Sequence, residues 1–193
     1  MSGKTATAPT RSFTVFLDRD GVLAKTRPVL FLSRIAQWEW LPGAKEAVAR
    51  LNRPGINVCL ATNQPFVATG LLRRTKLAEL HAWMMEELRA AGGRLDRIEA
   101  ATVPFGRRHK PRPGMLEDGG RALGADPKRA VMVGDNVKDA EAAHAYGCKA
   151  ILLSTSHSRP QLEAAMAKRG WDVPVVDGLP AAVDLILRRI AAS

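Results

Sequence analysis

The strongest constraint on the fold is an alternation along the chain, in which short apolar runs are separated by longer amphipathic stretches. Six runs have the length of strands, the last of them weak, and the stretches between them have the length and period of helices. This order predicts an α/β fold, a three-layer Rossmann-like arrangement with helices covering a central parallel sheet. The expected strands are 13–17, 56–61, 98–102, 130–134, 149–153 and 174–177, and the expected helices are 44–52, 71–91, 113–123, 137–145, 159–168 and 180–191.

Length and composition fit one compact domain. The chain has 193 residues, 46% of them hydrophobic, which allows a sizeable core. Residues 1–11 are small and polar, so we expect a disordered leader followed by a single domain over 12–193. No apolar run approaches the ~20 residues that span a bilayer, and the N-terminus lacks the apolar middle of a secretory signal. We therefore expect no membrane partner, a cytoplasmic location, and a monomer or small homo-oligomer.

The net charge and the cysteine content limit which ligands and metals the chain is expected to bind. The net charge of +10 attracts anionic ligands, which include phosphorylated metabolites and nucleic acid. Only 5% of the residues are aromatic, so basic and stacking side chains do not interleave, and nucleic acid is the less favoured partner. Cys59 and Cys148 lie in or beside apolar runs, as buried reduced thiols do. Neither belongs to a CxxC pair or has a histidine at ligand spacing, which argues against zinc.

Four polar sets stand where strands end or helices begin. Asp18-Arg19-Asp20-Gly21 follows the first expected strand, Thr62-Asn63-Gln64 follows the second, and Gly134-Asp135-Asn136 ends the fourth, with Asp139 close behind. His109-Lys110-Pro111-Arg112 precedes the helix that leads to the fourth strand. Ligands of such sheets bind beyond the carboxyl ends of the strands. We therefore expect the four sets to converge on one rim of the sheet.

Carboxylates gathered on one rim repel one another unless a cation neutralises them. Mg²⁺ prefers oxygen ligands and fits a site shared between acidic side chains, waters and a substrate phosphate. Lys110, the Thr62 hydroxyl and the Asn63 amide can hold phosphoryl oxygens. Asp18 can attack phosphorus to give an aspartyl-phosphate, and Asp20 can protonate the leaving alcohol and later deprotonate the attacking water. The sets thus predict phosphoryl transfer.

Each of these residues, taken alone, also has a structural explanation. An Asp after a strand is often a turn residue or a helix cap, and the run 107–110 could be an exposed basic loop. His81, His144 and His157 have no partner at a telling spacing, so we expect structural or surface roles for them. The four tryptophans are expected to serve packing rather than ligand stacking. The order and placement of the four sets favour the catalytic interpretation.

The four sets resemble the motifs of the haloacid dehalogenase-like (HAD) superfamily of phosphatases. FLDRDGVL is similar to the first motif, ATNQ to the second, KPRPGM to the third and GDNVKD to the fourth. The resemblance implies that Asp18 is the nucleophile and Asp20 the acid and base, with Thr62 and Lys110 completing the catalytic set.

The same resemblance implies a metal site. Mg²⁺ would be bound by the Asp18 side chain, the Asp20 backbone carbonyl and Asp135. Asn136 and Asp139 would support these ligands from the layer behind them.

Further stretches narrow the resemblance to the histidinol-phosphatase and heptose-bisphosphatase group. These are DRDGV, LPGAKEAVARL, TNQ with Gly70 seven residues after its Asn, HKPRPGML and GDNVKDAEAA, and together they span about Phe13 to Leu153. Such enzymes lack a large cap domain. The implied substrate is a sugar phosphate such as D-glycero-D-manno-heptose 1,7-bisphosphate. The alternatives are histidinol phosphate, a polynucleotide 3′-phosphate, and a non-catalytic module that binds a phosphorylated ligand.

One stretch departs from that group. Many members carry a zinc-binding loop, a Cys-x-His followed by a Cys-x-Cys, just before the third motif, whereas this chain has ATVPFGRRHKP there. We therefore expect no structural zinc, and we expect the basic residues of this shorter loop to line the pocket and hold a second phosphate. The residues expected to bind substrate or phosphate are Arg19, Asn63, Arg107, Arg108, His109 and Arg112.

Overall fold

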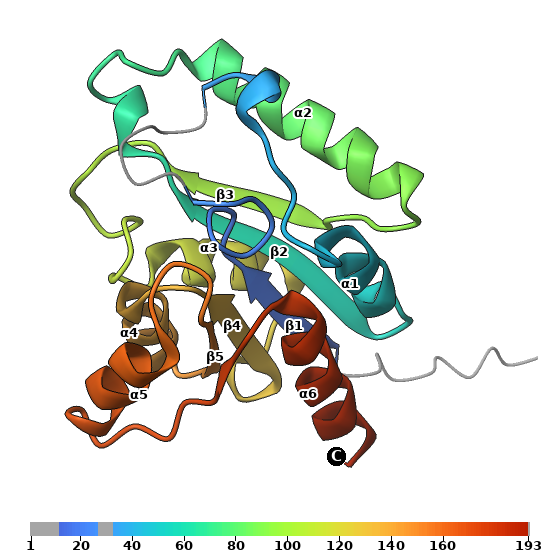
Figure 1. Cartoon of the computed structure of the whole chain (residues 1–193), viewed down its shortest axis with the longest axis vertical. Coiled ribbons are helices and arrows are strands. Elements are labelled where there is room, and N and C mark those ends of the chain that lie inside the picture. The colour runs from blue at the N-terminus through green and yellow to red at the C-terminus, as the bar shows by residue number, and fades with distance from the viewer. Residues whose placement is uncertain (1–11, 27–32, 193) are drawn as a thin grey trace, which may run out of the picture.

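A six-stranded parallel sheet runs through the computed structural model, which describes residues 12–26 and 33–192 (Figure 1). The expected leader, 1–11, lies outside the described residues. The strands are β1 (Phe13–Leu17), β2 (Ile56–Asn63), β3 (Arg97–Ala101), β4 (Ala130–Gly134), β5 (Lys149–Leu153) and β6 (Val175–Val176). The α-helices are α1 (Ala44–Leu51), α2 (Arg74–Ala90), α3 (Gly114–Leu123), α4 (Val137–Tyr146), α5 (Arg159–Ala167) and α6 (Leu179–Ala191).

The strand order is β3-β2-β1-β4-β5-β6, so the chain winds outward in both directions from the centre. β1 pairs with β2 on one side and with β4 on the other. This is the order of doubly wound sheets, in which ligands bind where the winding direction reverses, outside the carboxyl ends of the central strands. That point lies between β1 and β4.

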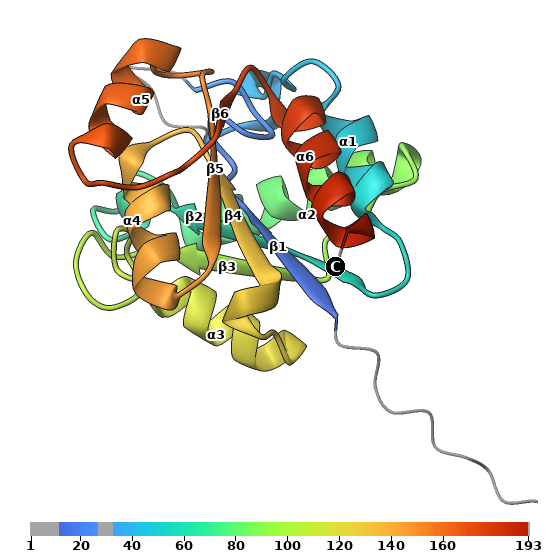
Figure 2. The same cartoon turned by 90° about the horizontal axis from the view of Figure 1, so that it is seen from below.

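Helices cover both faces of the sheet because strand side chains alternate between the faces. In β1, Val15 and Leu17 pack in a core cluster with α1, α2 and α6, whereas Phe16 packs on the other face with α3, α4 and α5. Figure 2 shows α1 and α6 on one side of the sheet and α3 on the other. The predicted three-layer α/β arrangement is confirmed.

The expected boundaries hold closely, and two differences matter for function. β2 extends past its expected end to Asn63, which pairs with Ala101 of β3. Thr62 and Asn63 therefore lie on the strand rather than in the loop that follows it. α2 begins at Arg74, three residues later than expected, because a short 3₁₀ turn (Pro65–Val67) and Gly70, with a positive φ of 76°, occupy the approach. In the described segments, only short 3₁₀ turns interrupt the loops after β1 and β2, so no large cap domain is inserted there.

The tryptophans pack as expected. Trp38, Trp40 and Trp83 form a cluster with ring centroids 5.0–6.2 Å apart beside the α1–α2 face. Trp171 stacks on His144 with centroids 4.4 Å apart. Among the described residues, no helix combines the length and apolarity needed to cross a bilayer.

Candidate active site

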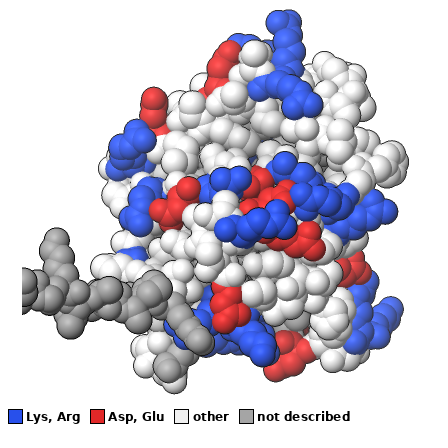
Figure 3. Space-filling model, turned by 180° about the vertical axis from the view of Figure 1, so that it is seen from behind, with Lys and Arg blue, Asp and Glu red and all other residues white. Residues whose placement is uncertain are grey.

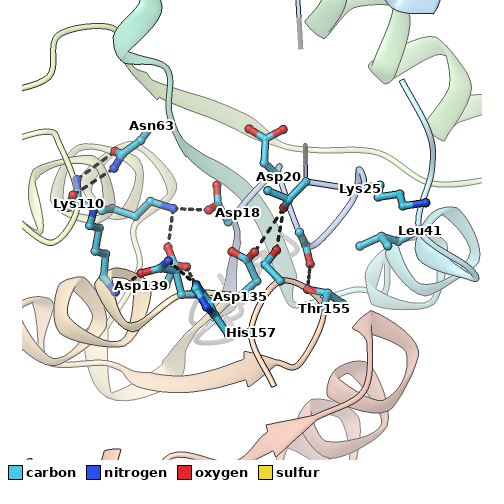
Figure 4. Close-up of a pocket in the computed structure, with 15 residues that line it drawn as sticks. Asp18, Asp20, Lys25, Leu41, Asn63, Lys110, Asp135, Asp139, Thr155 and His157 are labelled. Atoms are coloured by element: carbon cyan, nitrogen blue, oxygen red, sulfur yellow. Dashed lines mark hydrogen bonds and ion pairs between the residues drawn. The ribbon is translucent and has the colours of Figure 1, made fainter. Parts of the chain in front are cut away.

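The four polar sets meet at the carboxyl end of the sheet, around a cavity of about 520 Å³. Asp18 follows β1, and its backbone N–H donates to Val133 of β4 (2.9 Å), which fixes it at the reversal point of the sheet. Figure 4 shows Asp18, Asp139 and Lys110 pointing toward one another, with Asp135 beside them. The predicted residues that line it are Asp18, Asp20, Asn63, Lys110, Asp135, Asn136 and Asp139.

Three carboxylates form a cluster suited to a cation. Oxygen atoms of Asp18, Asp135 and Asp139 lie within 4.8 Å of one another. Burial raises the pKa of Asp135 to about 6, and the charge of Asp139 adds to the rise. Burial also raises the pKa of Asp18, against the opposing charge of Lys110. Such a cluster of oxygen donors fits Mg²⁺, because a bound cation removes the cost of holding these groups ionised.

Two glycines make this close approach possible. A Cβ on Gly21 would lie 1.9 Å from the Asp135 carboxylate, and one on Gly134 would lie 2.2 Å from the Asp139 carboxylate. Gly21 also has a positive φ of 78°, which a residue with a side chain adopts only under strain. The sequence therefore needs glycine at both positions to let the acidic side chains turn inward.

Lys110 is the buried cation of the site. Its side chain is only 2% exposed, and its Nζ lies 3.0 Å from Asp18 and 2.6 Å from Asp139. Burial lowers the pKa of Lys110, but the charges of Asp139 and Asp18 outweigh it and raise the pKa, so the group stays charged. Asn63 holds the lysine backbone through two hydrogen bonds, one accepted from its N–H (3.0 Å) and one donated to its C=O (3.1 Å).

Asp139 is held by the start of helix α4. Asn136 is the N-cap, and its side chain accepts from the N–H of Lys138 (3.1 Å). Asp139, at the third helical position, accepts from the N–H of Asn136 (3.1 Å) to complete a capping box. One Asp139 oxygen thus accepts from the Asn136 N–H and the other pairs with Lys110 Nζ, so this carboxylate can hold the lysine side chain in its orientation.

Arg19 and Thr62 lie behind the cavity rather than on its wall. Both are buried, with Arg19 1% exposed. The Arg19 guanidinium pairs with Asp20 at 3.0 Å and lies over the ring of Trp38. Asp20 and the tryptophan enclose Arg19, so it does not line the cavity, and its contact with substrate stays a prediction.

The prediction that the basic loop lines the cavity is wrong. Arg107 pairs with Asp118 (2.6 Å) and Glu117 (3.3 Å), while Arg108 pairs with Glu99 and, at 3.6 Å, with Asp118. These partners belong to β3 and α3, and α3 lies on the face seen in Figure 3, where acidic and basic side chains intermix. Nearby carboxylates thus bind the two arginines.

His109 and Arg112 do not reach the cavity wall either. His109 Nδ1 lies 3.2 Å from the backbone O of Val103, within its own loop, and Arg112 is exposed. Lys110 is the one described residue of 103–113 that lines the cavity.

The segment after β5 also lines the cavity, which was not predicted from sequence. Thr155 Oγ1 donates to the C=O of Gly21 (2.5 Å), and Ser156 and His157 also line the cavity. His157 Nε2 lies 3.1 Å from the Asn136 amide. The rule that ligands bind at the carboxyl ends of strands applies to β5 as to β1, so it could have identified these residues. The other unforeseen lining residues are Lys25, Thr26, Leu41 and Lys138.

Without divalent cations, ionisation of Asp135 should lower the free energy of unfolding as the pH rises from about 4 to about 6. The pKa of Asp135 is raised from 3.8 to about 6 in the fold, so the folded state holds a proton that the unfolded state releases. Saturating Mg²⁺ should reverse the loss, adding about 2.7 kcal/mol at a hundredfold excess over Kd. Urea unfolding at pH 5 and 7.5, in EDTA and in Mg²⁺, measures both effects.

An Asp135→Asn variant is the control, since it lacks the titrating group and should show a smaller pH slope. The same change in stability between the two pH values for the wild-type and variant proteins in EDTA, together with no gain from Mg²⁺, would contradict a cation site at this cluster.

Comparison with known proteins identifies relatives over most of the chain. A family model described as HAD-hydrolase-like matches residues 107–182. The chain is 35% identical to a D-glycero-beta-D-manno-heptose-1,7-bisphosphate 7-phosphatase of Rhodopseudomonas palustris, over 74% of this chain and 83% of the relative. It is 32% identical to a D-glycero-D-manno-heptose-1,7-bisphosphate 7-phosphatase of Thermosynechococcus vestitus, over 92% and 96%.

A solved structure with a related name is similar to this chain over most of its length. The D,D-heptose 1,7-bisphosphate phosphatase of B. bronchiseptica, complexed with magnesium and phosphate, superimposes with a TM-score of 0.82 at 32% identity, covering 92% of this chain and 99% of that one. The chain therefore belongs to the HAD-like phosphatase family that contains these heptose-bisphosphate phosphatases.

Proposed function

We propose that this protein is a Mg²⁺-dependent phosphomonoesterase that transfers the phosphoryl group of a sugar phosphate to Asp18. The observation that carries the proposal is the buried Lys110, held between Asp18 and Asp139 at the reversal point of the sheet. A fixed positive charge beside a nucleophilic carboxylate is suited to neutralise the oxygens of a transferring phosphoryl group.

The reaction has two steps. In the first, an Asp18 oxygen bonds to phosphorus as the ester P–O bond breaks, and the departing sugar oxygen takes a proton from Asp20. In the second, water attacks the aspartyl-phosphate, Asp20 takes a proton from that water, and inorganic phosphate leaves while Asp18 is restored. Mg²⁺, held by the Asp18 and Asp135 carboxylates and the Asp20 backbone carbonyl, would supply charge neutralisation at the phosphoryl oxygens.

The proposed substrate is a heptose bisphosphate such as D-glycero-D-manno-heptose 1,7-bisphosphate. The names of the relatives support it, although those names include both the beta and the alpha sugar. The cavity also supports it, because Lys138 and Lys25 line it in addition to the catalytic Lys110, with Lys25 paired to the exposed Glu39 at 3.0 Å. Two further cations suit a ligand with a second anionic group, and they suit the aminated histidinol phosphate less well.

Lys25→Ala and Lys138→Ala should each raise KM for the bisphosphate roughly 2–5-fold, as expected for exposed charges, and should change KM for a monophosphate less. Arg107→Ala is the matched control, because its guanidinium is engaged with Asp118 and Glu117 outside the cavity. Initial rates with a sugar bisphosphate and the matching monophosphate measure the difference. A larger rise in KM for Arg107→Ala than for either lysine variant would indicate that the basic loop binds the second phosphate.

Phosphate release from a panel of phosphate esters tests the proposed function. The panel contains heptose and hexose bisphosphates, histidinol phosphate and a 3′-phosphorylated oligonucleotide, each with Mg²⁺ and with EDTA. We expect Mg²⁺-dependent release from a sugar bisphosphate well above the others. Preferred release from the oligonucleotide would favour a polynucleotide phosphatase, and binding without turnover of any ester would favour a non-catalytic module.

A further inference from the structure

Behind Asp20 lies a buried network that the reaction above does not use. Its centre is Gln64, which is 2% exposed and directly follows β2. The Gln64 amide nitrogen donates to Asp20 Oδ2 (3.2 Å) and to Thr62 Oγ1 (2.9 Å), and its carbonyl oxygen accepts from Arg19 Nη2 (3.1 Å). One glutamine therefore joins the proposed acid and base to the buried Thr62 hydroxyl.

The orientation of this amide follows from its partners. Arg19 can only donate, so the Gln64 oxygen must face it. The Gln64 NH₂ group must then face Asp20 and Thr62, which both offer oxygens. Because the Thr62 oxygen accepts from Gln64, the buried hydroxyl helps to hold the amide in this orientation.

Asp20 is fixed from one side and open on the other. Arg19 donates to both of its carboxylate oxygens, at 3.0–3.3 Å, and Gln64 donates to one of them. The Asp20 side chain nevertheless keeps 32% of its surface exposed and lines the cavity. Arg19 is in turn enclosed beneath Trp38, with its guanidinium carbon 6.0 Å from the ring centroid. The carboxylate is thus held in place while it still faces a ligand.

We infer that Gln64, together with Arg19, is a positioning residue that fixes Asp20 toward the leaving-group oxygen. This role rests on the proposed function. Placement errors of about 1 Å can cost on the order of 100-fold in rate. Misplacement of the Asp20 carboxyl should therefore slow the reaction of esters whose leaving group needs a proton. It should have little effect on the rate for esters whose leaving group departs without one.

Gln64→Met tests the role, because methionine has similar length and volume but offers no amide. We expect kcat/KM for an alkyl phosphate, such as a sugar phosphate, to fall roughly 10–100-fold. For p-nitrophenyl phosphate, whose leaving group departs without a proton, kcat/KM should fall about 3-fold or less, because the first step then does not depend on a proton from Asp20. kcat/KM reports the first chemical step, so the later hydrolysis of aspartyl-phosphate does not obscure the comparison.

Two further variants complete the test. Gln64→Glu keeps the acceptor for Arg19 but loses the donors, so we expect the same selective loss of kcat/KM for the alkyl phosphate. It also tests the positioning role if the methionine variant does not fold. Gln161→Met, at an exposed site in α5, is the matched control and should leave both values unchanged.

An equal fall for both esters in the folded Gln64 variants would overturn the positioning role, because general damage has no leaving-group dependence. Wild-type values for both esters in either variant would also overturn it. If the wild-type protein released phosphate from neither ester, the proposed function itself would fail, and this role with it.

Discussion

The Asp18→Asn variant is expected to release phosphate on the order of 10⁴-fold or more slowly than the wild-type protein, since the amide cannot accept the phosphoryl group as the carboxylate does. The loss should be in kcat, because the cavity and Lys110 remain. Phosphate release in saturating Mg²⁺ measures it, with mass spectrometry to exclude deamidation back to aspartate.

The same substitution should not destabilise the metal-free protein. Burial and neighbouring carboxylates raise the pKa of Asp18 above that of the unfolded chain, so its ionised form opposes folding near neutral pH. Asparagine removes that charge, and the free energy of unfolding in EDTA at pH 7.5 should stay equal or rise. A large fall in stability would mean that Asp18 serves the fold rather than the chemistry.

Lys110→Met should impair both stability and activity. The lysine is the cation that Asp18 and Asp139 share in a buried setting, and removing one partner of a buried ion pair costs about 3–5 kcal/mol. Activity should fall to near background, because the phosphoryl oxygens lose their fixed positive charge. Urea unfolding and phosphate release measure the two losses.

A second substitution separates these losses. Lys110→Met combined with Asp139→Asn removes one of the stranded carboxylates, so it should recover part of the stability and none of the activity. Lys76→Met, at an exposed surface pair on α2, is the matched control and should cost less than about 1 kcal/mol. Equal effects of Lys110→Met and Lys76→Met on stability would contradict the buried ion pair.

Much of the fold is predictable from sequence, because buried parallel strands are short apolar runs and α/β connections carry helical periodicity. β1, β4 and β5 begin and end where their apolar runs do. The start of α2 is less predictable, since Leu71 and Leu72 continue its pattern while Gly70 and the preceding 3₁₀ turn delay the helix. The hydrophobic pattern of the sequence thus predicts where helices and strands lie, whereas the geometry of the neighbouring turns determines where they begin and end.

The carboxylates of the site are predictable for a related reason. Asp18 and Asp135 follow central strands, and topology alone brings such positions together. The basic loop was predicted wrongly because a run of cations looks the same whether it faces an anionic ligand or internal carboxylates. Glu99 and Asp118, remote in sequence from one another, decide that question for Arg108. Tertiary pairing of this kind leaves no local signal.

The most direct test of the account is to trap the phosphoryl group on the protein. Asp20→Asn protein is mixed with p-nitrophenyl phosphate and Mg²⁺, quenched in acid within one turnover, digested, and analysed by mass spectrometry. The first step needs no proton for this ester, whereas the second lacks its base, so aspartyl-phosphate should accumulate. We predict a single phosphorylated peptide with the modification on Asp18. Phosphate on another residue, or release of p-nitrophenol with no phosphorylated peptide, would contradict the central claim.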